Sequence, residues 1–246
     1  MFVDVHSHVI PSGDDGAADL ATGLELCREA ARHGTTVLYG TPHVWPHLGL
    51  SEERGREIQA AYRAMRPKAA EWGLELRLGY ELTPTVELLD ADLSRFTLEG
   101  TGLVLVELPF SGPLAVVERV AEHASDCGIT ALLAHPERAD EVVWDPLVTQ
   151  EYRARGWLLQ VNASSLTGRH GPEAEETGWL LLERGLASVV GSDGHRLARP
   201  PFLDAAYELV RARIGEEAAR LLFTGANLGI PSESAVSGVR PEDTPV

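Results

Sequence analysis

Amphipathic helical segments alternate with short apolar runs along most of this chain, and a glycine usually stands between the two. In the first unit, apolar residues recur at helical spacing from position 18 to 33, Gly34 follows, and an apolar run covers 36–39. Glycine is a common helix terminator because it accepts the left-handed backbone of the C′ position. Helical segments that alternate with short strands predict βαβ units and a parallel sheet.

About seven such units follow one another. Phe2, Val3 and Val5 predict a first strand, and further strands are predicted at 36–39, 74–78, 103–106, 129–134, 157–161 and 187–190. Helices are predicted at 18–33, 51–72 (kinked or divided at Pro67), 113–127 and 145–155, before Gly185, and at 201–214 and 216–223. Near-continuous apolar strands are expected where both faces are covered, which favours a closed α/β barrel. We expect one domain over residues 1–231 and a disordered tail over 232–246, which is rich in Ser, Gly, Pro and acidic residues.

Composition narrows the function classes. The chain has 246 residues, and its net charge of −16 argues against a nucleic-acid partner, which needs stripes of Lys and Arg. Bound cations that neutralise carboxylates would account for part of this acidity. No apolar run is long enough to span a bilayer and no secretory signal is visible, so we expect no membrane insertion. Cys27 and Cys127 fall in helical patterns and are expected to be reduced core residues of a cytoplasmic protein.

Potential metal ligands follow the predicted strands. His6 and His8 project to the same side of an extended backbone, about 6.6 Å apart along the strand. The others stand at the C-terminal ends of later strands, which in a (β/α) barrel open onto one face; they are His43, Glu81, Glu107, His135, Asp193 and His195. Pro11 and Gly13 turn Asp14 and Asp15 back toward the same pocket, and spacing alone does not decide between these two carboxylates. Nitrogen and oxygen donors suit Mn²⁺, Fe²⁺ or Zn²⁺, and their number predicts two or three ions, an arrangement typical of phosphoester or amide hydrolysis.

Two arginines follow the predicted ligands closely. Arg138 comes three residues after His135, and Arg199 comes four after His195, with Arg196 nearby as a competitor. A guanidinium beside a metal cluster can bind phosphate oxygens in a fork, so Arg138 and Arg199 are candidate phosphate-binding residues.

The ordered motifs resemble the PHP (polymerase and histidinol phosphatase) superfamily, and more closely its CpsB/CapC/YwqE group of bacterial metal-dependent protein-tyrosine phosphatases. The matching stretches are Asp4-Val5-His6-Ser7-His8 with Asp14-Asp15-Gly16, Thr41-Pro42-His43, Gly79-Tyr80-Glu81-Leu82, Glu107-Leu108-Pro109-Phe110, Ala134-His135-Pro136-Glu137-Arg138, Gln160-Val161-Asn162 and Ser192-Asp193-Gly194-His195. They span residues 4 to about 200.

The resemblance implies a distorted single-domain (β/α)7 barrel with a trinuclear site that is often occupied by manganese. It implies the metal ligands His6, His8, Asp15, His43, Glu81, Glu107, His135, Asp193 and His195, with Arg138 as a phosphate holder. Arg199 stands one position closer to the histidine than the corresponding family arginine. The implied substrate is a phosphorylated tyrosine kinase of capsule or exopolysaccharide synthesis. The segment Val44-Trp45-Pro46-His47 departs from the family pattern, which bears on substrate preference.

Direct hydrolysis is the expected mechanism: a hydroxide that bridges two ions attacks phosphorus in line. The Cys-x5-Arg loop of thiol-based phosphatases is absent, since His33 and Leu133 stand six residues after the two cysteines. Three alternatives remain open. They are a small-molecule phosphatase such as histidinol-phosphate phosphatase, an amidohydrolase with a glutamate bridge, and a metal-bound regulatory module without turnover. A carbamylated-lysine amidohydrolase is excluded because Lys68, the only lysine, lies in a predicted helix.

Overall fold

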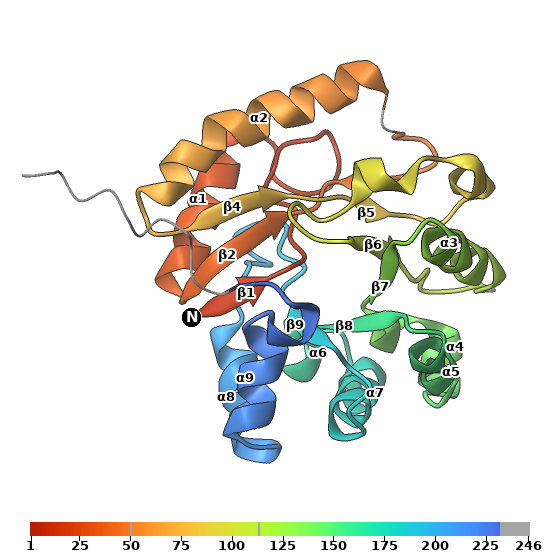
Figure 1. The fold of residues 1–246 in the computed structure, drawn as a ribbon. Coiled ribbons are helices and arrows are strands. Elements are labelled where there is room, and N and C mark those ends of the chain that lie inside the picture. The colour runs from red at the N-terminus through yellow and green to blue at the C-terminus, as the bar shows by residue number, and fades with distance from the viewer. Residues whose placement is uncertain (50, 113, 232–246) are drawn as a thin grey trace, which may run out of the picture.

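The computed structural model describes residues 1–49, 51–112 and 114–231, and these form a ring of parallel strands with helices outside it (Figure 1). Seven strand positions surround the centre, and two of them are split in two. The strands are β1 (Phe2–Asp4), β2 (Thr35–Gly40) with its continuation β3 (His43–Val44), β4 (Glu75–Leu78) with its continuation β5 (Glu81–Leu82), β6 (Leu103–Glu107), β7 (Thr130–Ala134), β8 (Leu158–Asn162) and β9 (Val189–Gly191).

The ring is closed by contacts between its first and last strands. Neighbouring strands pair in parallel in the orders β1-β2-β4 and β3-β5-β6-β7-β8-β9. Beyond β1 and β9, Ser7 and Gly194 form a parallel bridge. The amide of His8 donates to the Gly194 carbonyl at 2.7 Å, and the amide of Asp193 donates to the His6 carbonyl at 2.8 Å. The predicted seven-unit α/β barrel is therefore confirmed.

Alternate strand residues fill the inside of the barrel. Val3 and Val5, Val37 and Tyr39, Leu103 and Leu105, and Leu132 and Ala134 belong to one buried cluster. The residues between them, such as Val104 and Val106 of β6, belong to a second cluster under the helices. Both faces of each strand are thus covered, which explains the near-continuous apolar runs in the sequence.

Most of the predicted helices are present. They are α1 (Leu20–Arg32), α2 (Glu52–Ala70), α3 (Ala115–Asp126), α5 (Val148–Ala154), α7 (Pro172–Glu183), α8 (Asp204–Arg213) and α9 (Glu216–Phe223). Ser51 caps α2 by accepting from the Arg54 amide, as expected. Pro67 lies inside α2 without dividing it. Two short helices were not predicted: α4 (Asp140–Trp144) and α6 (Ala163–Leu166).

The barrel is irregular between β5 and β6. This connection contains only the 3₁₀ turns η1 (Val86–Asp90) and η2 (Leu93–Phe96), where an α-helix would complete a regular unit. Two further 3₁₀ turns, η3 (Pro136–Arg138) and η4 (Ala226–Leu228), follow β7 and α9. η3 directly follows His135 and ends at Arg138, so it places the candidate phosphate-binding arginine next to a predicted ligand.

One sequence expectation about the cysteines was wrong. Cys27 is buried as predicted, but Cys127 is exposed, because it lies just past the end of α3. The two thiols are not bonded to each other. In the part of the chain that the structure describes, no helix is both long and apolar enough to cross a bilayer. The predicted tail, 232–246, lies outside the described residues.

Candidate metal centre

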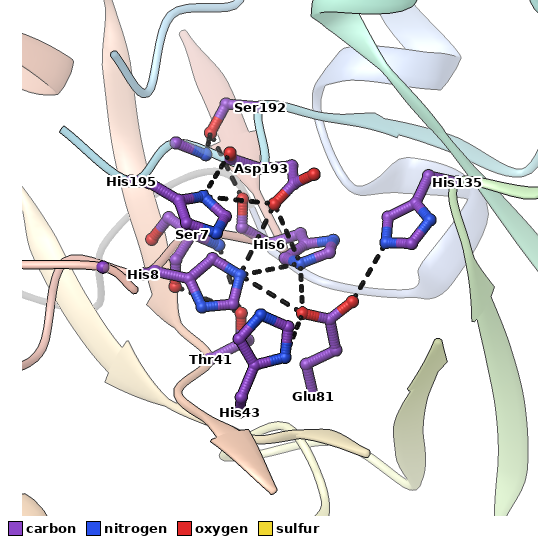
Figure 2. A network of polar contacts seen from close by, with 12 residues as sticks. His6, Ser7, His8, Thr41, His43, Glu81, His135, Ser192, Asp193 and His195 are labelled. Carbon is purple, nitrogen blue, oxygen red and sulfur yellow. Dashed lines mark hydrogen bonds and ion pairs between the residues drawn. The ribbon is translucent and has the colours of Figure 1, made fainter. Parts of the chain in front are cut away.

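The C-terminal ends of the strands bring the predicted ligands to one face of the barrel. His6 and His8 follow β1 on extended backbone, and their Nε2 atoms lie 3.2 Å apart, so both point to the same side as predicted. His43 lies on β3, Glu81 on β5 and Glu107 at the end of β6, while His135 directly follows β7. Asp193 and His195 follow β9. Figure 2 shows these imidazoles converging on the carboxylates of Glu81 and Asp193.

Glu81 lies at the centre of the cluster. Its Oε2 is 3.0 Å from His6 Nε2, 3.2 Å from His8 Nε2 and 3.1 Å from His43 Nδ1. Its Oε1 is 3.0 Å from His135 Nε2. Asp193 Oδ1 lies 3.5 Å from His6 Nε2 and 3.4 Å from His8 Nε2. Six strand ends thus contribute donor atoms to one small volume.

The donor set fits divalent cations. Glu81 Oε2 and His43 Nδ1 lie close to other donor atoms of the cluster but make no hydrogen bond of proper geometry within the described residues, and neither does buried His135 Nδ1. Buried polar atoms are nearly always paired, and an ion is one of the standard explanations of exceptions. Four groups of three residues each bring ligand atoms within 4.8 Å of one another; they are His8-His43-His195, His6-His8-Asp193, His6-Glu81-His135 and His43-Glu81-Glu107. These overlapping groups suit a cluster of ions better than one isolated ion.

Hydrogen bonds behind the cluster fix which ring nitrogen faces it. His6 Nδ1 lies 2.8 Å from Gln160 Oε1, so this nitrogen carries the proton and Nε2 is free to bind a cation. His195 Nδ1 lies 2.8 Å from the Asp193 carbonyl, which directs His195 Nε2 inward in the same way. Gln160 in turn donates from Nε2 to Asn162 Oδ1 at 2.8 Å, and Asn162 donates to Asp193 at 2.8 Å.

The two neighbouring aspartates have different surroundings. Asp14 accepts from the backbone amides of His43 and Gly16 at 3.0 and 3.1 Å, so it holds the loop that carries His43. Asp15 Oδ1 lies 3.3 Å from His195 Nε2 and 3.7 Å from His43 Nε2. Asp14 Oδ2 also lies 3.7 Å from His8 Nδ1, the ring nitrogen that does not face Glu81, so Asp14 supports the predicted ligands from behind while the Asp15 carboxylate approaches the cluster through His195.

The buried carboxylates and imidazoles of the cluster shift one another's pKa values. Burial would raise the pKa of the Glu81 carboxyl, but the nearby His6 and His43 hold this pKa well below its usual value. Burial would raise the pKa of the Asp193 carboxyl as well, but His6 and His8 hold it well below its usual value. Burial would also lower the pKa of His6, yet the charges of Glu81 and Asp193 raise it. At His43 burial prevails despite the Glu81 charge and lowers the pKa to about 4. Ionised carboxylates and a neutral imidazole, as at His43, are the forms that bind a cation.

Two proposed ligands have strained backbone. The backbone φ is 38° at His135 and 53° at Asp193. No other non-glycine residue in the described chain has a positive φ. This conformation costs roughly 1–2 kcal/mol at a residue with a Cβ and is concentrated at functional sites.

Arginine side chains border the cluster. Arg138 Nη1 lies 3.5 Å from Asp193 Oδ2, and Arg199 forms an ion pair with the same oxygen. Arg199 Nε is buried and makes no hydrogen bond within the described residues. Arg196 is exposed and donates to the Asp15 carbonyl, so Arg199 is the better placed of the two arginines that follow His195.

One cavity joins these features. Seven of the nine predicted ligands, all but the fully buried His6 and His8, line it together with Arg138, Arg199, Trp45 and Phe110. Lys68 lies on α2 and pairs with Glu71 at 2.9 Å, with 58% of its side chain exposed, so the only lysine of the chain is not part of the cavity.

Sequence reasoning gave no role to several residues at the site. Asn162 ends β8 as the predicted ligands end their strands, and Gln160 lies two residues before it on the same strand; that position is the signal that was available. Arg54 had no such signal, because a polar residue in an amphipathic helix usually faces solvent. Its buried guanidinium donates to the carbonyls of Ser12, His43 and Leu48 at 2.8–3.0 Å.

A closed α/β barrel with clustered histidines, carboxylates and two arginines at its C-terminal face is the arrangement of a metal-dependent barrel hydrolase. The sequence model of the family described as capsular polysaccharide synthesis, CpsB/CapC, matches residues 2–229. The chain belongs to this family.

Relatives and solved structures agree with this assignment. The tyrosine-protein phosphatase YwqE of Bacillus subtilis strain 168 is 26% identical over 232 residues, covering 92% of this chain and 90% of the relative. The tyrosine-protein phosphatase CpsB of Streptococcus agalactiae serotype III is 28% identical over 232 residues, covering 90% and 94%.

Among solved structures, one described as belonging to the YwqE and CpsB pair of "unique metal-dependent tyrosine phosphatases" superposes with a TM-score of 0.77 at 25% identity. It covers 89% of this chain and 90% of that one. A D-hydantoinase superposes with a TM-score of 0.53 at 15% identity, covering 91% and 69%, and shares the fold alone.

Proposed function

We propose that this protein is a metal-dependent protein-tyrosine phosphatase, with residues 1–231 as its catalytic domain. Its substrate is a phosphorylated tyrosine kinase of capsule or exopolysaccharide synthesis. The observation that carries the proposal is the single cavity in which nitrogen and oxygen ligands meet two arginines. The names of the relatives and the family match support the reaction class. The unpaired cysteines support a cytoplasmic setting.

In this proposal nine residues hold two or three manganese ions: His6, His8, Asp15, His43, Glu81, Glu107, His135, Asp193 and His195. Such a set of imidazoles and carboxylates also accepts Fe²⁺ or Zn²⁺. When bound, the ions supply an activated water for direct attack on phosphorus and neutralise charge on the phosphate oxygens.

The chain itself binds and orients the substrate. Arg138 and Arg199 each use part of their guanidinium on Asp193 and keep other N–H groups for phosphate oxygens, where negative charge spreads during the reaction. Gln160 keeps His6 in the tautomer whose Nε2 faces the centre. A tyrosine leaving group has a pKa of about 10, so it leaves with little help from an acid.

No cysteine acts as nucleophile in this proposal. Burial raises the pKa of the Cys27 thiol to about 12, which suppresses the reactive thiolate. Cys127 lies between α3 and β7, so it stands at the N-terminal end of the barrel strands, opposite the cavity. The Cys127 thiol lies 3.9 Å from His123 Nδ1, and at that end of the barrel it is out of reach of the proposed phosphate site.

Phosphate release from a phosphotyrosine peptide tests the proposal. The wild-type protein is assayed with Mn²⁺, Fe²⁺, Zn²⁺ or EDTA, beside His6→Ala and with histidinol phosphate as the competing substrate. We expect turnover with Mn²⁺, loss of turnover in EDTA and in His6→Ala, and full activity after alkylation by N-ethylmaleimide. Faster turnover of histidinol phosphate would favour the small-molecule phosphatase, and inactivity with every metal would favour the regulatory module.

A further inference from the structure

Two aromatic residues supply the carbon surface of the metal cavity. Trp45 and Phe110 are the only lining residues within the described chain that have no ionisable side chain. The charged residues account for metal and phosphate binding. We therefore expect the part of a substrate that is not phosphate to contact these two rings.

Trp45 is held in place by its neighbours. Its ring stacks on the His43 imidazole, with ring centroids 4.4 Å apart and planes 27° from parallel. His47 stacks on Trp45 as well, with centroids 5.2 Å apart and planes at 26°. The Leu48 amide donates to the Trp45 carbonyl at 3.1 Å, and the Leu48 carbonyl accepts from buried Arg54 at 3.0 Å. These contacts hold the half-buried indole in place before a ligand arrives. Binding against it therefore costs little side-chain entropy.

Phe110 is held by the phosphate-binding side of the cavity. The Arg138 guanidinium lies over its ring, 4.2 Å from the centroid, and the His135 ring is 5.8 Å away. Its carbonyl accepts from the Asp140 amide at 2.8 Å, which fixes the end of the β6 loop. Even so, 48% of the Phe110 residue surface is exposed. A large aromatic ring that lines a cavity and remains this exposed has surface left for a ligand.

We propose that Trp45, together with Phe110, binds the aromatic ring of the substrate and makes the site selective for aryl over alkyl phosphomonoesters. This inference rests on the proposed phosphatase function and assigns its specificity to two residues. Aromatic rings attract each other in stacked and edge-to-face arrangements beyond the effect of area burial, whereas an alkyl chain gains from area alone. Arg138 contributes to the binding of both the ring and the phosphate group. Its guanidinium lies over the Phe110 ring, and it borders the proposed phosphate site.

Binding of two phosphonates that resist hydrolysis tests the inference without turnover. Calorimetry with Mn²⁺-loaded protein gives the dissociation constants of phenylphosphonate and methylphosphonate, and inorganic phosphate reports on the metal and arginine site alone. We expect the wild type to prefer phenylphosphonate by at least about tenfold, in keeping with one favourable aromatic pair plus buried ring area. Trp45→Ala should lose about tenfold of this preference and keep the wild-type affinity for inorganic phosphate.

Three further variants test whether the preference for phenylphosphonate depends on an aromatic ring at position 45. Trp45→Phe should keep most of the preference, Trp45→Leu should lose it, and Trp144→Ala, at a residue that is 91% exposed, should match the wild type. Equal losses for phosphate and phenylphosphonate in Trp45→Ala would mean that Trp45 acts only through His43, and the inference would be wrong. Full preference in Trp45→Leu, or none in the wild type, would overturn it as well.

The proposed function is judged separately. Failure of the wild type to release phosphate from a phosphotyrosine peptide overturns that function, whatever the phosphonate ratio. Normal peptide turnover together with an unchanged ratio in Trp45→Ala overturns only the role of the aromatic residues.

Discussion

At the scale of single residues, the site depends on the side chains behind the proposed ligands as much as on the proposed ligands themselves. Gln160 is fully buried, accepts from His6 Nδ1 at 2.8 Å and donates to Asn162, which in turn holds Asp193. One amide therefore orients a proposed imidazole ligand and, through Asn162, a proposed carboxylate ligand. Hydrogen-bond partners behind a metal site commonly contribute 10–100-fold to metal affinity.

Replacing the side-chain amide of Gln160 should lower the affinity for metal more than it lowers the stability of the fold. In Gln160→Leu the His6 ring loses the acceptor that fixes its tautomer, so we expect the affinity for Mn²⁺ to fall about 10–100-fold. Titration of metal-free protein with Mn²⁺, followed by calorimetry, measures this. Gln150→Leu, at an exposed position on α5, is the matched control and should bind like wild type. Equal affinities of Gln160→Leu and wild type would contradict the role given to Gln160.

The convergence of the proposed ligands, apart from Asp15, could be predicted because each lies at or near the end of an apolar strand, where a buried polar residue is unusual. Asp15 could not be separated from Asp14 by that argument, since both lie in one turn, and the resemblance to the family selected it. Only the three-dimensional arrangement shows that Asp14 binds backbone amides and that Asp15 approaches His195. Choices between neighbouring residues depend on loop geometry, which spacing along the chain does not encode.

At the scale of elements, the closure of the barrel depends on how closely β9 and the loop after it approach their neighbours. Gly194 pairs with Ser7 and packs against Pro201, where a Cβ would lie 2.6 Å from the Pro201 Cα and N atoms. Backbone atoms cannot move aside as a flexible side chain can. A residue with a side chain at this position would therefore displace Asp193 and His195 on either side of it.

Gly194→Ala should consequently impair both stability and activity. Overpacking of this kind costs roughly 1–3 kcal/mol, and the displaced ligands should reduce phosphatase turnover in addition. Thermal unfolding and metal content measured on the same preparation separate the two effects. Gly102→Ala is the control, because a Cβ there meets no atom within 4 Å. A Gly194→Ala protein with wild-type metal content and turnover would show that the close approach is not needed.

A second connection between elements is made by Arg54 of α2. Its guanidinium joins the Ser12 loop, the His43 strand and the Leu48 turn by hydrogen bonds to their carbonyl oxygens. Arg54→Met keeps most of the side-chain volume but leaves three carbonyls without this donor. We expect the free energy of unfolding to fall by about 2–4 kcal/mol, as measured by urea denaturation. Arg56→Met, whose side chain is 72% exposed, should change it by less than about 0.5 kcal/mol.

Elements with strong periodicity could be predicted from the sequence, and short ones could not. The β strands and long helices were found because their apolar spacing is repeated over several turns or pleats. α4 and α6 contain five and four residues, too few for a period to be visible. The strands β3 and β5 contain two residues each and exist because neighbouring strands supply their hydrogen bonds. Pro67 did not break α2, since tertiary packing of the helix outweighs the local preference.

At the scale of the whole molecule, the excess of acidic residues is related to the proposed metal centre. The chain carries a net charge of −16, and four carboxylates converge at one end of the barrel. Without cations these groups repel one another in a buried space. With cations bound, β1, β3, β5, β6, β7 and β9 are joined at their ends through shared ligands. Metal binding should therefore stabilise the fold as well as enable the reaction.

Removal of metal should lower the unfolding temperature by an amount that reports on affinity. A ligand that binds only the folded state at a hundred times its dissociation constant adds about 2.7 kcal/mol, which for a chain of this size corresponds to about 5–10 °C. Thermal unfolding in EDTA and in graded Mn²⁺ measures the shift. His6→Ala, which removes a donor common to two of the ligand groups, should show a much smaller shift. Identical curves with and without Mn²⁺ would mean that the strand ends are held together without cations, and the proposed centre would lose its physical basis.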